Sequence, residues 1–301
     1  MTRVAIPDSH IDYDFRLPPG MGGIVPSEGD ATFGATWPSS LRVFDRSEWA
    51  DVKREQEVNL GTVHVGRLYL DPWNDQSPES SCVYNSAEST WRYCWTRQLG
   101  KRFVMKCSPM SGYGCVTRRR HSGSTMWGAM ERLTEVGLLP ESSSAMSEAP
   151  GLSLCHDRAK QLCRHHFHQN TPFATKDAFP DGWRVTAKHF RVLEWVRLDT
   201  REQFASARLH RMPICYGRSG HAICGCDLVQ DERRRWLCEY LDSYDRDRGD
   251  HGRLYDTERH WSTGGAWAAA SVVLPDDPTA PAGSNGLTVS DGELARLYPA
   301  A

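Results

Sequence analysis

The stretch of sequence that decides the fold runs from residue 76 to residue 95 and reads QSPESSCVYNSAESTWRYCW. After Cys82, apolar side chains recur at helical spacing, at Val83, Ala87, Trp91 and Cys94/Trp95. The two residues before the cysteine, Ser80 and Ser81, have side chains that cap helix N-termini. The stretch therefore predicts a helix that begins at a cysteine.

Cys82 is the first candidate for chemistry in this chain. A thiol at the start of a helix lies at the positive end of the helix dipole, which favours the thiolate, and a nearby imidazolium would favour it further. The sequence has ten cysteines, and the ordinary role of such residues is that of a buried structural thiol. Its position at a helix start sets Cys82 apart from the others.

A partner for the cysteine comes from two β-rich runs, residues 221–229 and 236–244, which are joined by a polar turn at 230–234. We expect them to form an antiparallel hairpin. With the turn centred on its middle residues, His221 lies directly opposite Asp242. Opposed Cβ atoms are about 4.5–5.5 Å apart, close enough for a carboxylate to orient an imidazole. A slip of one residue would move one partner to the other face.

The order and spacing of these residues resemble the papain family of cysteine peptidases. Gln76 precedes Cys82 by six positions, as a glutamine precedes the nucleophile in that family. The segment Gly220-His221-Ala222-Ile223 resembles the family's histidine motif, and Leu241-Asp242-Ser243-Tyr244 resembles its Asn-Ser-Trp motif. The chain order Cys, His, Asp also agrees, and the resemblance spans roughly residues 70–275.

The resemblance implies a role for each matching residue. Cys82 would be the nucleophile, His221 the general acid/base, Asp242 its orienting partner and Gln76 a donor to the oxyanion. The implied reaction is hydrolysis of a peptide or related amide bond through a thioester, with a peptide or protein as substrate and with no cofactor and no metal. Asp242 stands where the family usually has asparagine, although an aspartate can also orient a histidine.

A looser match concerns the substrate cleft. Residues 104–107 and 113–115, followed by Ser122-Gly123-Ser124, resemble the segment that lines the cleft in the papain family. By the same resemblance we expect Ser122, Gly123, Ser124 and Gly220 to be the substrate-binding positions. Tyr244 replaces a tryptophan of the family, and Glu79 replaces the cysteine that would pair with Cys115, so that disulfide cannot form. The resemblance leaves a Cys107–Cys163 bridge open, although a chain without a secretion signal would more often keep both thiols reduced.

The distribution of elements predicts an α+β protein with helices and strands segregated. Helices are expected from Cys82, over 126–136 and after Thr200, and strands over 185–196, 213–216, 221–229, 236–244 and 265–274. The resemblance implies a papain-like two-lobed fold, with an N-terminal helical lobe, a C-terminal antiparallel β-rich lobe and the cleft between them. The expected divisions are an irregular N-terminal arm (1–60), a papain-like domain (61–275, with lobes at about 76–150 and 183–275) and a C-terminal tail (276–301).

Composition and charge limit the partners. A chain that is 39% hydrophobic can bury a core, and a formal net charge of −2 gives no general reason for binding nucleic acid or a membrane. No run of about 18 apolar residues is present, and the first 15 residues lack the pattern of a secretion signal. We therefore expect a cytoplasmic or virion-associated bacterial or bacteriophage protein.

Two alternatives remain open from the sequence. The first is a structural or assembly protein, for example a virion component, that uses the fold as a body and the N-terminal arm to bind an assembly partner. The arm shows no long helical pattern, so an inhibitory prosegment is not expected. The arm could instead dock on a partner, wrap over the surface of the domain or lie across the cleft. The second is a metal site at Cys155, His156 and 163–168, whose spacing matches no zinc pattern.

Overall fold

The protein was analysed as a computed structural model. It describes residues 1–13, 23–25, 27–31, 33–70, 74, 76, 80–99, 106–116, 123–139, 184, 187–244, 247–261 and 265–273. Ser122, the Cys155 to His168 segment and the expected C-terminal tail lie outside these residues. The division into arm, domain and tail stays a prediction.

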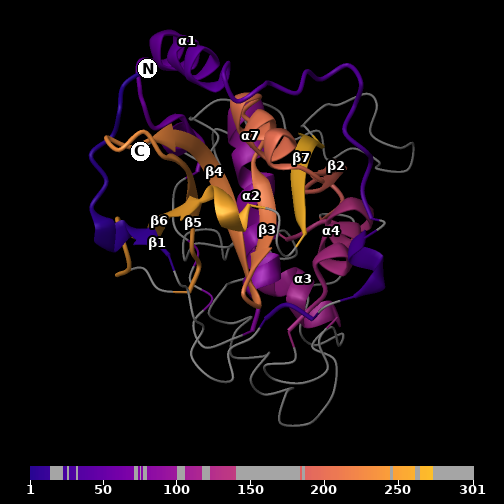
Figure 1. The fold of residues 1–301 in the computed structure, drawn as a ribbon. Coiled ribbons are helices and arrows are strands. Elements are labelled where there is room, and N and C mark those ends of the chain that lie inside the picture. The colour runs from indigo at the N-terminus through magenta and orange to yellow at the C-terminus, as the bar shows by residue number, and fades with distance from the viewer. Residues whose placement is uncertain are drawn as a thin grey trace.

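Helices form most of the first half of the described chain and strands most of the second (Figure 1). The α-helices are α1 (Trp49–Leu60), α2 (Cys82–Leu99), α3 (Pro109–Val116), α4 (Met126–Glu135) and α7 (Arg201–Leu209). Short 3-10 helices are η1 (Asp8–His10), η2 (Glu28–Ala31), η3 (Val65–Leu68) and η5 (Glu258–His260). The predicted α+β class, with segregated elements, is confirmed.

One seven-stranded sheet organises the second half. Its strands are β1 (Ile11–Asp12), β2 (Val192–Arg197), β3 (Ile214–Arg218), β4 (His221–Gln230), β5 (Trp236–Leu241), β6 (Arg253–Thr257) and β7 (Ala266–Val272). Their order is β1-β6-β5-β4-β3-β7-β2, and every pairing is antiparallel except that of β1 with β6. The N-terminal arm thus supplies an edge strand of a sheet whose other strands lie at least 180 positions later in the chain.

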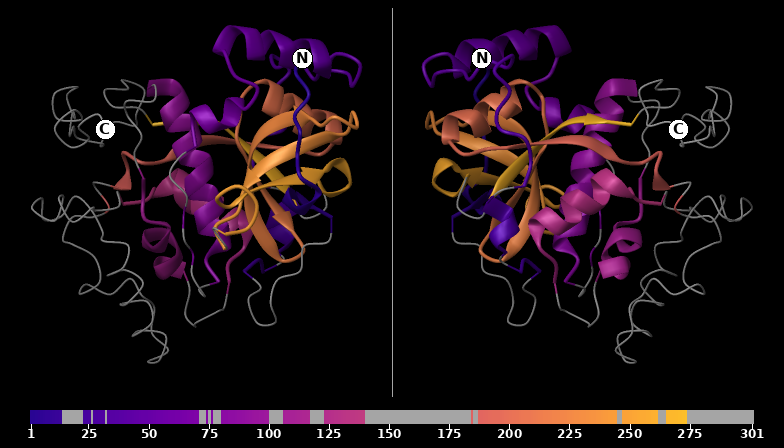
Figure 2. Two further views of the ribbon diagram at one scale, coloured as in Figure 1. Left: turned by 90° about the vertical axis from the view of Figure 1, so that its left-hand side faces the viewer. Right: turned by 90° about the vertical axis from the view of Figure 1, so that its right-hand side faces the viewer.

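The central helix α2 joins the two halves. All of its residues from Cys82 to Thr96 are buried, because α3 and α4 cover one side and strands β3, β4 and β7 the other. Figure 2 shows α3 and α4 on one side of α2 and the strands on the other. Since burial of apolar surface is the main stabilising term in folding, α2 is fixed in place along nearly its whole length.

A second core lies on the other face of the sheet, under α1 and α7. Trp49 of α1, Phe204 of α7 and Trp261 meet there, and the last two rings stack at 5.0 Å. The N-cap Thr200 and Gln203 form a capping box that starts α7, as expected after Thr200. The arm, although expected to be irregular, therefore includes a helix that closes this core.

Several predicted boundaries differ from the structure. The strand expected over 185–196 begins only at Val192, because the chain at Ala187–Phe190 turns and the Phe190 N–H bonds back to Ala187 O. The helix expected over 126–136 ends at Glu135 and is capped by Thr125, whose side chain accepts from Gly128 N–H. Strands β1 and β6 were not predicted, since both are short and rich in charged residues.

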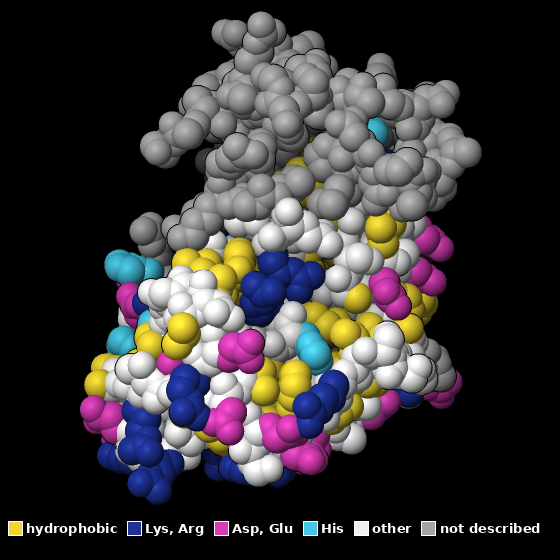
Figure 3. All heavy atoms as spheres, turned by 90° about the horizontal axis from the view of Figure 1, so that it is seen from above, with side chains coloured by type: hydrophobic (Ala, Val, Ile, Leu, Met, Phe, Trp, Pro, Cys, Tyr) yellow, Lys and Arg dark blue, Asp and Glu magenta, His cyan; other side chains and the backbone are white. Residues whose placement is uncertain are grey.

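On the face seen from the α1 side, the described residues form no extended area of one charge. Figure 3 shows basic and acidic side chains mixed with apolar ones over the described part of this face. Among the helices of the described residues, none has the length and apolar character needed to cross a bilayer.

Candidate active site

The helix start that carries Cys82 is fixed by local hydrogen bonds. Asn85 N–H donates to Ser81 O at 3.0 Å, and the Asn85 side-chain amide donates to Ser81 Oγ, also at 3.0 Å. Ser81 therefore lies at the N-cap and Cys82 is the first helical residue. Its thiol lies at the positive end of the helix dipole and is fully buried.

His221 is placed by the tight hairpin between β3 and β4. The two turn residues, Ser219 and Gly220, have φ values of 47° and 82°, and Arg218 pairs with His221 across the turn. Two consecutive residues with positive φ form the turn type whose twist matches the flanking strands. His221 therefore begins β4 directly after a rigid turn, and its side chain is buried.

The predicted contact between His221 and Asp242 is present. His221 Nε2 lies 2.8 Å from Asp242 Oδ1, and the same oxygen accepts the Tyr244 N–H at 2.9 Å. The predicted register is wrong, however. Cys224 pairs with Leu241, so continuation of this register places His221 opposite Tyr244, two residues from the expected partner.

Charge coupling at this site is strong. Burial by itself lowers the pKa of His221, but the carboxylate of Asp242, with a smaller contribution from the Cys82 thiol, raises it to about 10. Burial would raise the pKa of Asp242, yet the His221 imidazolium lowers it. The Cys82 thiol interacts with the His221 side chain, whose Nε2 is on Asp242, so Nδ1 is the ring nitrogen that remains for the thiol.

Gln76 reaches the site through the residue after Asp242. Gln76 N–H donates to Ser243 O at 2.9 Å, and Ser243 Oγ donates to Gln76 Oε1 at 2.7 Å. These bonds fix the side-chain amide and leave its NH₂ group as the donor at the other end. The buried Gln76 is thus held against the same loop that positions Asp242.

The N-terminal arm lies directly over the cysteine. A Cβ atom added at Gly23 would lie 2.2 Å from Cys82 Sγ, so a close approach of backbone to sulfur requires glycine here. Gly23 N–H and Ile24 N–H both donate to Gly220 O at 3.0 Å. Segment 23–25 therefore covers the thiol, while β1 and α1 of the same arm pack on the sheet, so the arm both wraps the domain and crosses the site.

The same segment occupies the positions expected to bind substrate. Ser124 N–H donates to Gly23 O at 2.8 Å, and Val25 N–H donates to Ser124 O at 2.9 Å. A Cβ added at Gly123 would lie 2.6 Å from Gly23 O. Gly123, Ser124 and Gly220 thus hold an extended peptide between them, whereas Ser122 lies outside the described residues.

The other described cysteines differ from Cys82 in surroundings. Seven cysteines are free and buried, namely Cys82, Cys94, Cys107, Cys215, Cys224, Cys226 and Cys238. Burial raises the pKa of both Cys94 and Cys224 to about 11 and raises that of Cys215 further. These thiols stay protonated near neutral pH, and the described part of the chain contains no disulfide.

One cluster has the residue types of a metal site. His64, Asp227 and Glu239 each offer a ligand atom, all within 4.8 Å of one another. Lys53 Nζ, however, lies 2.7 Å from Asp227 Oδ1, and Arg67 Nε lies 2.9 Å from Glu239 Oε1. Protein cations therefore already neutralise both carboxylates. The cluster instead fastens α1 and η3 to the sheet.

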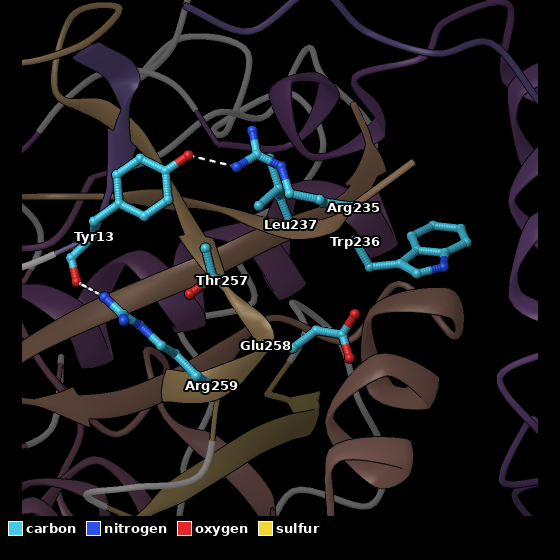
Figure 4. A pocket seen from close by; sticks show the side chains of 7 residues that line it. All are labelled: Tyr13, Arg235, Trp236, Leu237, Thr257, Glu258 and Arg259. Carbon is cyan, nitrogen blue, oxygen red and sulfur yellow. Dashed lines mark hydrogen bonds between the residues drawn. The ribbon is translucent and has the colours of Figure 1, made fainter. Parts of the chain in front are cut away.

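A pocket of about 300 Å³ opens beside β1, β5 and β6 (Figure 4). Its lining residues are Tyr13, Arg235, Trp236, Leu237, Thr257, Glu258 and Arg259. Arg235 donates to the Tyr13 hydroxyl and Arg259 donates to its carbonyl oxygen. The lining includes neither Cys82 nor His221, so this pocket is the seam where the arm docks and not the candidate active site.

Three residues at the site escaped sequence reasoning: Gly23, Ser243 and Arg248. Arg248 Nη1 lies 3.2 Å from Asp242 Oδ2. Ser243 stands within the quoted Asp242 motif, so its contact with Gln76 could have been suspected. Gly23 stands in an ordinary turn-rich stretch, and Arg248 in a loop of alternating charges, YDRDRGD over 244–250, that is typical of solvated surface.

In comparisons with family models and with curated proteins, nothing matches this sequence. Solved structures do match it. Xylellain, a cysteine protease from Xylella fastidiosa, shares 15% identity over 86% of this chain and 99% of that one, with a TM-score of 0.55. The proCathepsin B S9 of Trypanosoma congolense shares 12% identity over 84% and 86%, with a TM-score of 0.52. The chain therefore has the two-lobed papain-like fold that the sequence predicted.

Proposed function

We propose that this chain is a papain-like cysteine hydrolase that cleaves peptide or related amide bonds. The observation that carries the proposal is the meeting of Cys82, His221 and Asp242 beside backbone groups that already hold an extended peptide. Cys82 comes from α2 and His221 from β4, so the pair joins the two halves of the fold. Fold likeness alone would not support a reaction.

The proposed reaction is acyl transfer. The Cys82 thiolate attacks the carbonyl carbon of the scissile bond, while its proton resides on His221 as the imidazolium. The oxyanion accepts from Cys82 N–H, which as the first helical residue has no carbonyl partner within α2, and from the Gln76 NH₂ group. His221 protonates the leaving amine. Water, deprotonated by His221, then hydrolyses the thioester and regenerates the thiol.

An extended peptide is the substrate class that the site supports best. Gly220 O, Ser124 N–H and Ser124 O bond to the backbone of segment 23–25, without use of its side chains. Main-chain recognition of this kind gives affinity, while adjacent side chains give specificity. A peptide substrate would replace the arm at these groups, so we propose that the enzyme with its arm in place is latent.

The test is hydrolysis of a mixture of internally quenched peptides by the wild-type chain and by Gly23→Ala, whose arm is expected to leave the site. Cys82→Ala and His221→Ala in the Gly23→Ala background should abolish turnover. Cys94→Ala is the matched control, because Cys94 is a buried thiol of the same helix whose contact is with Ala269 O. This control should retain turnover.

The rival proposal is an assembly protein that uses the same fold, with the arm as its docking segment. It predicts no turnover in any variant and no difference between Cys82 and Cys94 in reactivity toward alkylating agents. That combination would refute the hydrolase. Turnover that survives in Cys82→Ala would refute the assignment of the nucleophile.

A further inference from the structure

The second oxygen of the Asp242 carboxylate is held by an arginine. Oδ1 faces His221 Nε2 and Tyr244 N–H, whereas Oδ2 lies 3.2 Å from Arg248 Nη1. Asp242 is fully buried, and the Arg248 side chain is 31% exposed. An asparagine at this position, as the resemblance would suggest, would carry no charge for an arginine to balance. Arg248 therefore balances a charge that exists only because this position holds an aspartate in place of an asparagine.

Arg248 is held in turn by the N-terminal arm. Its Nη2 lies 3.6 Å from Oδ2 of Asp12, the last residue of β1, and the Tyr240 hydroxyl donates to the same oxygen at 2.7 Å. Asp12 is only 7% exposed. A chain of alternating charges therefore runs from Asp242 through Arg248 to Asp12. Water and salt screen the interactions of the two buried carboxylates only weakly.

The arm is fixed where it makes this contact. Arg218 Nη1 lies 3.1 Å from both Asp12 Oδ2 and Asp256 Oδ1, and His260 Nδ1 lies 2.7 Å from Asp256 Oδ1. The neighbouring Tyr13 accepts hydrogen bonds from Arg235 at its hydroxyl and from Arg259 at its carbonyl oxygen, as Figure 4 shows. Asp12 thus faces Arg248, Arg218 and Tyr240, and its distance from the site is set by a docked strand.

We infer that Arg248 is a positioning residue for the His221–Asp242 pair and that Asp12 of the N-terminal arm moderates the charge that Arg248 applies there. The inference rests on the proposed function for its catalytic meaning. Arg248 competes with the His221 imidazolium for the negative charge of Asp242, because each binds one of the carboxylate oxygens. Asp12 neutralises part of the charge of Arg248, so the Asp242 carboxylate stabilises the His221 imidazolium more strongly.

The two residues therefore act on His221 with opposite sign. Asp242 and the Cys82 thiol both raise the pKa of His221, and a Cys82→Ala background removes the contribution of the thiol. In this background, NMR titration of the His221 ring should show a pKa about one unit higher in Arg248→Gln, because a nearby cation disfavours the imidazolium. In Asp12→Asn it should be lower by about half a unit.

Asp12 acts through Arg248, which a double-variant cycle tests. In Arg248→Gln, the further change Asp12→Asn should no longer lower the pKa of His221. Arg248→Lys keeps the charge and should keep the wild-type value. Asp250→Asn is the matched control. The Asp250 carboxylate lies in the same loop as Arg248 but pairs with Arg67, at 2.6 Å. Its loss should leave the pKa of His221 unchanged.

The inference is overturned if Arg248→Gln lowers the pKa of His221 or leaves it unchanged, or if Asp12→Asn has the same effect with and without Arg248. Arg248 is partly exposed, so its variant should fold even where Asp12→Asn does not. The titration needs no turnover. Shifts of the expected signs in a protein that hydrolyses nothing would uphold this inference and refute the proposed function. Hydrolysis without these pKa shifts would uphold the proposed function and refute this inference.

Discussion

The His221 imidazole and the Asp242 carboxylate meet at 2.8 Å because β4 contains one extra residue relative to β5. Between Gly225 and Asp227 the register shifts, so that two residues of β4 stand against one of β5. Without this bulge at Cys226, His221 would share a face with Ser243, and Asp242 would point to the other side. The bulge places the two side chains on one face as diagonal neighbours.

Cys82 should be alkylated selectively when the arm is away from it. In Gly23→Ala at pH 7, iodoacetamide should modify Cys82 at least about tenfold faster than Cys94 or Cys224, because only thiolates react and burial raises the pKa of the other two to about 11. Mass spectrometry of peptides measures each rate. His221→Ala in the same background should slow modification of Cys82 alone. Equal rates at all three thiols would contradict the activated cysteine.

Gly23→Ala should itself expose the thiol. The new Cβ would lie 2.2 Å from Cys82 Sγ, so either the sulfur or segment 23–25 must shift. We expect the segment to move and to give up its bonds to Gly220 and Ser124, because Cys82 is fully buried in the core. We expect faster alkylation of Cys82 than in the wild type, with an unchanged circular dichroism spectrum. Val25→Ala changes an exposed side chain of the same segment and should behave as wild type. A wild-type rate in Gly23→Ala would show that the segment does not limit access.

Ser243→Ala should reduce turnover through Gln76. The Ser243 hydroxyl donates to Gln76 Oε1, and its loss frees the amide to rotate away from the oxyanion. Loss of an oxyanion donor lowers kcat by about 10²–10³, so Gln76→Ala should fall in this range and Ser243→Ala should lose less. Ser206→Ala removes another buried serine, bonded to Phe44 N–H far from the site, and is the control. If Ser243→Ala and Gln76→Ala changed KM and left kcat unchanged, Gln76 would not be a donor to the oxyanion.

Glu239→Gln should destabilise the fold at neutral pH. Burial would raise the pKa of Glu239, but His64, Arg67 and Arg253 lower it to about 2. A folded-state pKa below the unfolded value stabilises above about pH 4.3, and this contribution is lost as pH falls toward 2. The free energy of unfolding should drop by about 3 kcal/mol at pH 7. Urea unfolding at pH 7 and at pH 3 measures the difference.

A matched comparison for Glu239→Gln is Glu258→Gln, which breaks an exposed pair with Arg46. Exposed pairs contribute about 0–1 kcal/mol, so this variant should stay close to wild type at both pH values. If Glu239→Gln is equally mild, or if its effect persists undiminished at pH 3, the buried ion pairs around η3 do not stabilise the fold.

Local sequence was sufficient where a structure depends on near neighbours. The helix that begins at Cys82 follows from apolar spacing and a serine cap, and the β4–β5 hairpin follows from two β-rich runs with a polar turn. The contact of His221 with Asp242 was predicted from the wrong register. It is nevertheless present because the error was two residues, and side chains alternate with a period of two.

Long-range placement was beyond reach of the sequence. Gly23 stands 59 positions before Cys82, and nothing in its turn-rich surroundings indicates that it covers the sulfur. Likewise Arg248 and Asp12 read as solvated charges until the docking of β1 on β6 brings them together. No periodicity links such residues, because their contacts arise only when separate elements pack.

The sequence by itself determined the helices α2, α4 and α7, the strands β3, β4, β5 and β7, the α+β class and the residue types of a thiol–imidazole–carboxylate group, because these depend on periodicity and on short spacings. Tertiary structure alone decided which face of β4 carries His221, through the bulge at Cys226, and where the arm lies over Cys82 and beside Arg248. The physical reason is that burial and pairing of distant segments select one arrangement among many that the local sequence allows equally.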